Sequence, residues 1–375
     1  MAGNPRLENL VSWFAASVLV AAGVIYVLKP GDDREQPDFA RPPPRATPAQ
    51  EPLILQERRA AEIGRGRWAR APRQIPWAGW KDILVRTYRE ILDDRLLALA
   101  AGVVFYSLLA LFPAIAAGVS SYALFANPAT VSNHLEIAAD IVPANVLDIL
   151  RTEITRIAAK SDGNLTFGFL LGLAIALWSA NAGMKAIFDA LNVIYDENEK
   201  RGLVALNLVS LFFTICAIAG VVLAVALVVV FPLLLAAFGV TFDHPFVRYL
   251  RWPVLFLLII FALSVLYRYG PSRRRVKWRW ISIGSVFAAL AWLAVSSLFS
   301  WYLSNFANYN ATYGALGAVV GLMMWMWLSS IVVLVGAELN SEIEHQTAQD
   351  STVGQDKPLG SRGAVMADTV GAAVT

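Results

Sequence analysis

The sequence contains few charged residues, a single cysteine and three histidines. Charged residues make up 16% of the 375 residues, whereas hydrophobic residues make up 57%. This balance does not describe a soluble surface and indicates a membrane protein. Because Cys216 is the single cysteine, an intramolecular disulfide is excluded. His134, His244 and His345 lie far apart, and no CxxC, P-loop or GxSxG pattern is present. We therefore expect no metal, no cofactor and no enzymatic activity such as RNA cleavage.

Long runs without a charged residue predict the membrane-spanning helices. A helix needs about 20 apolar residues to cross the hydrocarbon core. The last run is long enough for two helices, and the polar stretch NFANYNAT at 305–312 divides it. We predict one N-terminal span and a six-helix core from the runs 10–28, 98–125, 165–184, 203–240, 252–267 and 280–337.

The fold class is predicted to be an all-α integral membrane protein with four parts. Residues 1–29 form an N-terminal transmembrane anchor, because the uncharged run is long and no A-x-A site marks a cleaved signal peptide. Residues 30–74 are rich in proline and arginine, which predicts a disordered cytoplasmic linker. Residues 75–345 form the membrane domain and begin with an interfacial amphipathic helix. Residues 346–375 are predicted to be a disordered cytoplasmic tail.

The distribution of Lys and Arg predicts the orientation in the membrane. In alternating loops, 25 of the 31 Lys and Arg residues fall on one side. Basic residues resist translocation, so this side is cytoplasmic. The N-terminus is then outside, and the C-terminus is cytoplasmic.

Four polar residues lie on one face of the run that follows residue 165. Asn181, Lys185 and Asp189 are four residues apart, and Asn192 continues close to the same face. At this spacing Lys185 and Asp189 can pair, and Asn181, the deepest, can hydrogen-bond to another helix. The face is either one wall of a cytoplasm-facing polar cavity or an ordinary helix end, with Lys185 extended to the membrane surface.

The last apolar run ends on an acid, Glu338, followed by Asn340. A carboxylate at a helix C-terminus meets the negative end of the helix dipole, so a cation is expected nearby. We predict that Glu338 pairs with a cation of the same membrane side and that Asn340 caps or bridges this network. The pair either fastens the last helix or forms part of a gate. The candidate cations are Lys185, Arg201, Arg268 and the cluster at 273–279.

Small residues in the last run predict close helix packing. Gly317 and Gly321 form a GxxxG pattern, with Gly314 before them. Such a pattern allows two helix backbones to approach closely.

A basic cluster precedes the long run 280–337. Two interpretations stay open for it: contact with anionic lipid at the cytoplasmic face, or a topology anchor of the kind the positive-inside rule requires. The cluster consists of Arg273, Arg274, Arg275, Lys277 and Arg279.

Three blocks of this sequence resemble the YihY/BrkB family of bacterial inner-membrane proteins. They are AGVVFYSLLALFP (101–113), LWSANAGMKAIFDALNVIYD (177–196) and YGALGAVVGLMMWMWLSSIVVLVGAELN (313–340), in the order of the family. The resemblance covers about residues 75–345. It implies a six-helix core in the bacterial inner membrane, and a history of labels such as ribonuclease BN and virulence factor.

Two functions are compatible with these features. The first is a transporter or exporter of a small or lipidic solute, with a polar pocket near Asn181, Lys185, Asp189 and Glu338. The alternative is a non-transporting envelope or scaffold protein, in which the same polar groups hold helices together. A transporter requires water to reach these positions, whereas a scaffold does not.

Overall fold

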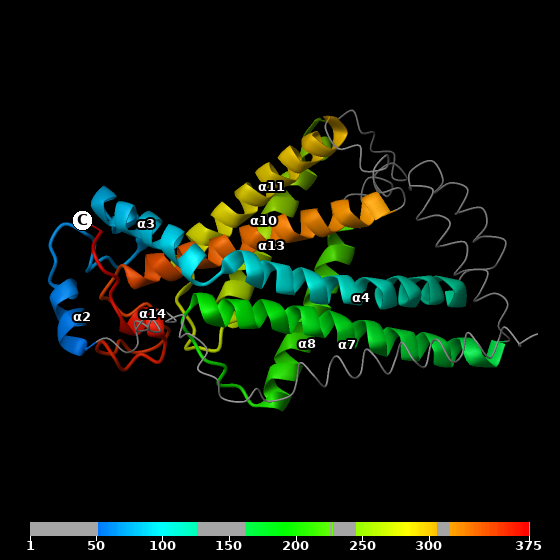
Figure 1. Ribbon diagram of the computed structural model, residues 1–375, viewed down its shortest axis with the longest axis horizontal. Helices are drawn as coiled ribbons and strands as arrows, with labels where there is room; N and C mark the ends of the chain where they lie inside the picture. Colours follow the sequence, from blue (N-terminus) through cyan, green and yellow to red (C-terminus); the bar gives the residue numbers. More distant parts are fainter. Residues whose placement is uncertain (1–51, 126–161, 226, 228–244, 306–315, 375) are drawn as a thin grey trace, which may run out of the picture. The chain divides into compact units, whose positions relative to one another are not determined.

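The computed structural model describes residues 52–125, 162–225, 227, 245–305 and 316–374. Within these residues the chain is helical, with no strand and one isolated antiparallel bridge, between Val276 and Thr352. A helix satisfies its own backbone hydrogen bonds, which is why apolar runs adopt this form in lipid. The long helices are α4 (Leu96–Phe125), α7 (Asp162–Ile194), α8 (Leu203–Val225), α10 (Pro245–Tyr269), α11 (Ser282–Asn305) and α13 (Leu316–His345) (Figure 1).

Five of these helices contain segments that are long and apolar enough to cross a membrane. In α4, Leu96–Ala110 is a shorter apolar stretch. The predicted all-α membrane fold is therefore confirmed, and the run 280–337 divides into α11 and α13 as expected. The count of six core spans plus one anchor stays a prediction, since residues 1–29 lie outside the described part. The five segments are Leu171–Ile194, Leu203–Ala224, Trp252–Tyr269, Ser282–Asn305 and Val319–His345.

The helix α13 contacts α3, α4, α7 and α11. Its close approach to α11 occurs at Gly336 and Gly284, where a Cβ added to Gly284 would clash with the carbonyl oxygen of Gly336. The predicted approach was elsewhere: Gly314 lies outside the described residues, and Gly317 is buried. A Cβ added to Gly321 would meet no atom of the described residues within 4 Å. The described helices therefore come together nearer the C-terminal end of α13 than the GxxxG pattern predicts.

The apolar spans leave most of their side chains on the outside of the bundle. In the α8 segment 11% of the residues are buried, and Leu208 and Phe212 are each 63% exposed. Lipid tails solvate such side chains as well as a protein core does. This surface is consequently the one that faces the bilayer.

One end of the bundle is formed by polar segments that lie far apart in the sequence. We call it the polar end: α3 (Trp77–Asp93), the loops after α7 and α10, and residues 346–374, all in contact around the C-terminal end of α13. Figure 1 shows α3 and α14 at the same end of α13. The shorter elements there are α2 (Leu53–Ala60), α14 (Val365–Asp368) and the 3₁₀ turns Pro72–Gln74 and Trp278–Trp280.

The C-terminal segment is ordered, which corrects the prediction of a disordered tail over 346–375. Thr347 is fully buried, and its hydroxyl donates hydrogen bonds to the carbonyls of Arg67 (3.2 Å) and Ala69 (2.8 Å). The Lys277 amide donates to the Ser351 carbonyl at 2.8 Å. Sequence composition missed this order because polar contacts replace the apolar residues that the segment lacks.

The predicted linker over 30–74 also differs in its second half. Residues 30–51 lie outside the described part, but Leu53–Ala60 is helical, and Arg67 has a fully buried side chain. Ordered residues of this region pack against the C-terminal segment, as when Val370 N donates to the Gln56 side chain. The ordered domain therefore begins before residue 75.

Candidate functional site

The four polar residues predicted on α7 do not share one environment. Asn181 is 6% exposed, and its side-chain oxygen has no hydrogen-bond partner among the described residues. Lys185 lies 6.0 Å from the centre of the Trp178 ring. Asp189 is exposed, and the described residues show no salt bridge between it and Lys185. The predicted Lys185–Asp189 pair is thus not formed.

The fourth residue, Asn192, joins the loops after α7 and α10. Its side-chain oxygen accepts a hydrogen bond from the Ser272 amide at 2.7 Å, and its nitrogen donates to Glu199 at 3.1 Å. Arg201 pairs with the same carboxylate at 2.7 Å. Although burial acts to raise the pKa of Glu199, the hydrogen bonds from Arg201 and Asn192 lower it to about 2. Asn192 therefore belongs to a satisfied structural network.

Glu338 does not pair with a cation, contrary to the prediction. Its side chain is 1% exposed, and neither carboxylate oxygen has a hydrogen-bond partner among the described residues. The cations go instead to the next acids along α13. Arg86 pairs with Glu342 at 2.5 Å, and Arg273 pairs with Glu344 at 2.8 Å. Glu338 is left as a buried carboxyl group inside the last span.

Asn340 bridges two helices, but not through Glu338. Its side-chain oxygen accepts a hydrogen bond from the Gly284 amide at 2.8 Å, and its nitrogen donates to the Ile281 carbonyl at 3.1 Å. The amide oxygen thereby satisfies the Gly284 N–H, one of the backbone donors left free in the first turn of α11. Asn340 therefore fastens α13 to α11 beside the Gly284–Gly336 contact.

The surroundings of Glu338 are acidic. Asp94 lies in the turn between α3 and α4, and burial, followed by the charges of Glu90 and Asp196, raises the pKa of Asp94 to about 7. Asp94, Glu342, Glu90 and Asp196 also act electrostatically on Glu338. Within the described residues, no group of three or more His, Cys, Asp or Glu side chains has a geometry able to hold a metal ion.

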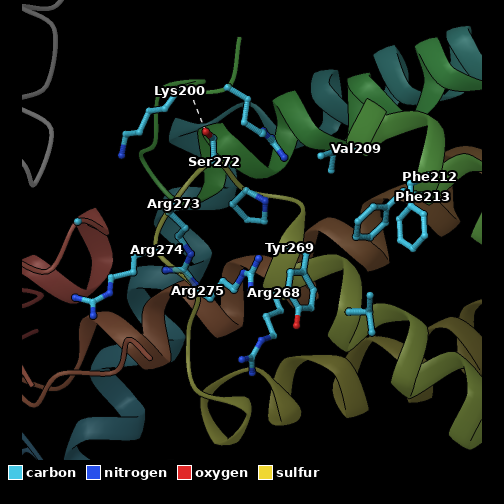
Figure 2. Close-up of a pocket in the computed structure, with 14 residues that line it drawn as sticks. Lys200, Val209, Phe212, Phe213, Arg268, Tyr269, Ser272, Arg273, Arg274 and Arg275 are labelled. Atoms are coloured by element: carbon cyan, nitrogen blue, oxygen red, sulfur yellow. Dashed lines mark hydrogen bonds between the residues drawn. The ribbon is translucent and has the colours of Figure 1, made fainter. Parts of the chain in front are cut away.

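A pocket of about 550 Å³ lies between the N-terminal half of α8 and the C-terminal end of α10, on the side predicted to be cytoplasmic. We call it the basic pocket. None of the six predicted cavity residues lines it, although three members of the basic cluster do. Figure 2 shows arginines from the loop after α10 together with aromatic rings of α8. Its charged lining residues are Lys200, Arg201, Arg268, Arg273, Arg274 and Arg275.

The basic cluster is divided between this pocket and the C-terminal segment. Arg274 donates its amide hydrogen to the Gly363 carbonyl at 3.1 Å. Lys277 donates its side-chain hydrogen bonds to the Asp350 carbonyl and to Asp356. Arg279 is exposed and does not line the pocket. Part of the cluster is consequently covered by protein.

Sequence reasoning missed the pocket because its cations come from separate loops. Arg201 and Arg268 are predicted only as partners for Glu338, and Lys200 has no predicted role. The available signal is that all three residues lie on one predicted side of the membrane, Lys200 and Arg201 in a loop and Arg268 in the last turn of α10. Their convergence depends on how α8 and α10 pack.

Apolar helices of membrane-spanning length, joined at one polar end, define a multi-pass α-helical membrane protein. The family described as Virulence factor BrkB matches residues 87–359. This match covers well over half of the sequence, and the chain belongs to the BrkB (YihY) family.

Individual relatives agree with this assignment. The chain is 32% identical over 247 residues to the ribonuclease-like protein YfkH of Bacillus subtilis, an alignment that covers 64% of this chain and 88% of the relative. It is 24% identical over 275 residues to a UPF0761 membrane protein of Janthinobacterium, covering 72% of this chain and 61% of that protein. A third relative, a UPF0761 membrane protein of Pseudoalteromonas translucida, is 26% identical over 69% of this chain and 85% of its own length. The chain thus spans less than two thirds of the Janthinobacterium protein. No solved structure matches the chain.

Proposed function

We propose that this chain transports or exports a small or lipidic solute across the bacterial inner membrane and is not an enzyme. The observation that carries the proposal is Glu338, a carboxyl group in the last span that is 1% exposed and lacks a hydrogen-bond partner among the described residues. An ionisable side chain inside a membrane span is costly, so such groups usually face a water-filled path or pair with one another.

Asn181 supports the same proposal from α7. Its side-chain oxygen is buried inside a span and has no partner among the described residues. An unpaired buried polar atom costs roughly 1 to 3 kcal/mol, a cost that water or a passing solute offsets. Asn181 and Glu338 belong to α7 and α13, two helices that contact each other.

The proposed orientation places the C-terminus in the cytoplasm and the N-terminus outside. Contacts between loops support it, because segments predicted to be cytoplasmic meet at one end of the bundle. Arg273 of the loop after α10 pairs with Glu344 of α13, and the amide of Lys200, after α7, donates to Ser272 at 2.9 Å. Most Lys and Arg residues are predicted to lie on this side, which the positive-inside rule assigns to the cytoplasm. The exposed side chains of the basic cluster are then available to anionic lipid.

A non-transporting scaffold is the second candidate. Asn192 and Asn340 favour it, because the oxygen and the nitrogen of each side chain form hydrogen bonds that join segments. If Asn181 and Glu338 are likewise enclosed by protein without water, the bundle is a packed structural unit.

Cysteine accessibility distinguishes the two functions. After Cys216→Ser, single cysteines at Asn181 and Glu338 are treated with a small polar thiol reagent from each side of the membrane. Transport predicts reaction at both positions, since water must reach them. The control is Ala190→Cys, a fully buried position of α7 in the apolar core, which should stay protected. Protection at Asn181 and Glu338, with reaction at Lys185→Cys alone, overturns the transport proposal and supports the scaffold.

A further inference from the structure

The basic pocket has an excess of positive charge over its nearest acids. No Asp or Glu of the described residues lines it. Lys200 pairs with Glu197 at 2.6 Å, and the pairs of Arg201 with Glu199 and Arg273 with Glu344 are described above. Three lining cations have no carboxylate within salt-bridge distance in the described part of the chain: Arg268, Arg274 and Arg275.

Several guanidinium hydrogens in this pocket are buried without an acceptor. Among the described residues, Nε and Nη1 of Arg268, Nε and Nη2 of Arg273 and Nη1 of Arg274 have no hydrogen-bond partner. Arg268 is 9% exposed, and the Arg273 side chain is 1% exposed. A buried donor that has lost water and gained no acceptor costs roughly 1 to 3 kcal/mol, and more when it is charged. The unmet donors therefore point to a ligand with several anionic oxygens.

Aromatic rings hold two of these guanidinium groups in place. The Arg268 guanidinium lies 4.4 Å from the centre of the Trp278 ring, and that of Arg273 lies 4.0 Å from the centre of the Tyr195 ring. Stacking orients a guanidinium plane and leaves its edge, which carries the hydrogens, free for an anion. The fork of an arginine matches the oxygens of a phosphate group.

The opposite wall of the pocket is apolar and continues into the lipid-facing surface of α8. This wall is formed by Val209, Phe212 and Phe213 of α8 and Val265 of α10, with Phe212 63% exposed (Figure 2). A free phosphate ion gains nothing from contact with an apolar wall, whereas a hydrocarbon chain that packs against it buries apolar surface. The two walls together suit an amphiphile.

We propose that the basic pocket is a discrete binding site for the phosphate group of an anionic phospholipid, whose acyl chain lies along α8. The phosphate accepts hydrogen bonds from Arg268, Arg273 and Arg274, and Arg275 adds positive charge. This inference extends the lipid contact proposed above from a surface attraction to one saturable site. It depends on the proposed membrane position of the polar end, but not on transport.

Lipid retention on the purified full-length protein tests the site. The protein is exposed to mixed micelles containing equal amounts of phosphatidylglycerol and phosphatidylcholine, and native mass spectrometry counts the lipids retained. We expect one phosphatidylglycerol per chain, bound at least about tenfold more tightly than phosphatidylcholine. Arg268→Gln should reduce this affinity about tenfold or more, and Arg268→Lys, which keeps the charge but loses the fork, should reduce it less.

The matched control is Arg279→Gln, which removes a charge of the same loop outside the pocket and should leave retention unchanged. If Arg268→Gln does not fold, as judged by its elution and melting temperature, Arg274→Gln replaces it with the same expected loss. The proposed site is overturned if the protein retains the two lipids equally, or if Arg279→Gln loses as much phosphatidylglycerol as Arg268→Gln does. Either result indicates a general electrostatic attraction of the basic surface to anionic lipid. A third outcome is that the protein binds inorganic phosphate at the pocket but does not prefer phosphatidylglycerol to phosphatidylcholine. This result overturns the lipid assignment and favours a soluble phosphate compound as the ligand. Lipid retention measures binding, whereas cysteine accessibility measures the entry of water. A negative result for the lipid site therefore leaves the transport proposal untouched.

Discussion

The apolar spans keep most of their residues on the outside, whereas the polar end buries charged side chains in pairs. Between 11% and 22% of the residues in the span segments are buried, while Arg273 and Glu344 each expose 1% of their side chains. Hydrocarbon solvates leucine or phenylalanine without a specific partner, but a buried ion requires an opposite charge and hydrogen bonds. The spans therefore depend on composition, and the polar end depends on particular partners.

This difference teaches where a substitution should matter. A change on the lipid-facing side of a span replaces one lipid contact by another, whereas a change at the polar end leaves a buried partner unsatisfied. The close contact between α11 and α13 lies between these extremes, because it carries no charge but leaves room only for a hydrogen atom at Gly284.

The largest effect should follow from Arg86→Ala. This side chain bonds the Glu342 carboxylate, the Gln346 side chain and the Ala372 carbonyl, and so connects α3, α13 and the C-terminal segment. Its loss leaves a buried carboxylate without its cation, which costs roughly 3 to 5 kcal/mol of unfolding free energy. Thermal unfolding of the purified protein measures the change.

Arg89→Ala is the control for this prediction, because Arg89 lies on the same helix and is exposed. It should change the unfolding free energy by less than about 0.5 kcal/mol. If the two variants unfold alike, pairing at the polar end does not govern stability, and the comparison with the spans fails.

An intermediate effect is expected for Gly284→Ala in α11. The added methyl group meets the Gly336 carbonyl oxygen and the Asn340 side chain, so α11 and α13 must separate. Overpacking of this kind costs roughly 1 to 3 kcal/mol. Gly321→Ala in α13 is the matched control, since an added Cβ there meets no atom within 4 Å in the described part of the chain. Equal destabilisation by both variants would contradict a close contact at Gly284.

The smallest effect, measured as the change in stability per pH unit, concerns Asp94. Its pKa of about 7 in the folded protein lies above the value of about 3.9 in an unfolded chain. Between these values the folded state binds more protons, so stability falls as pH rises from about 4 through 7. The slope attributable to one group is below about 1.4 kcal/mol per pH unit and is reduced further by solvent.

Asp94→Asn should therefore flatten this decline, and melting temperatures recorded from pH 5 to pH 8 measure it. Glu57→Gln is the control, because Glu57 is an exposed acid of α2 whose charge does not act on Asp94. An unchanged slope in Asp94→Asn would show that other groups carry the pH dependence.

Sequence patterns predicted the helices well and their polar contacts poorly. The charge-free runs led to α8, α11 and α13, because twenty apolar residues in lipid have few alternatives to a helix. The amphipathic segment after residue 75 is the helix α3. Glu338 was identified as unusual, but its predicted cation was wrong, since Arg86 and Arg273 pair with its neighbours Glu342 and Glu344.

What the sequence by itself determined is the class of protein, the main spans and the family, all of which depend on composition and local order. Tertiary structure alone decided which cations converge on the basic pocket, where α11 meets α13, and that residues 346–374 are ordered. The physical reason is the distance along the chain over which each interaction acts. Helix formation in lipid depends on residues within one segment, whereas a pair such as Arg86 with Glu342 joins residues that only the folded chain brings together.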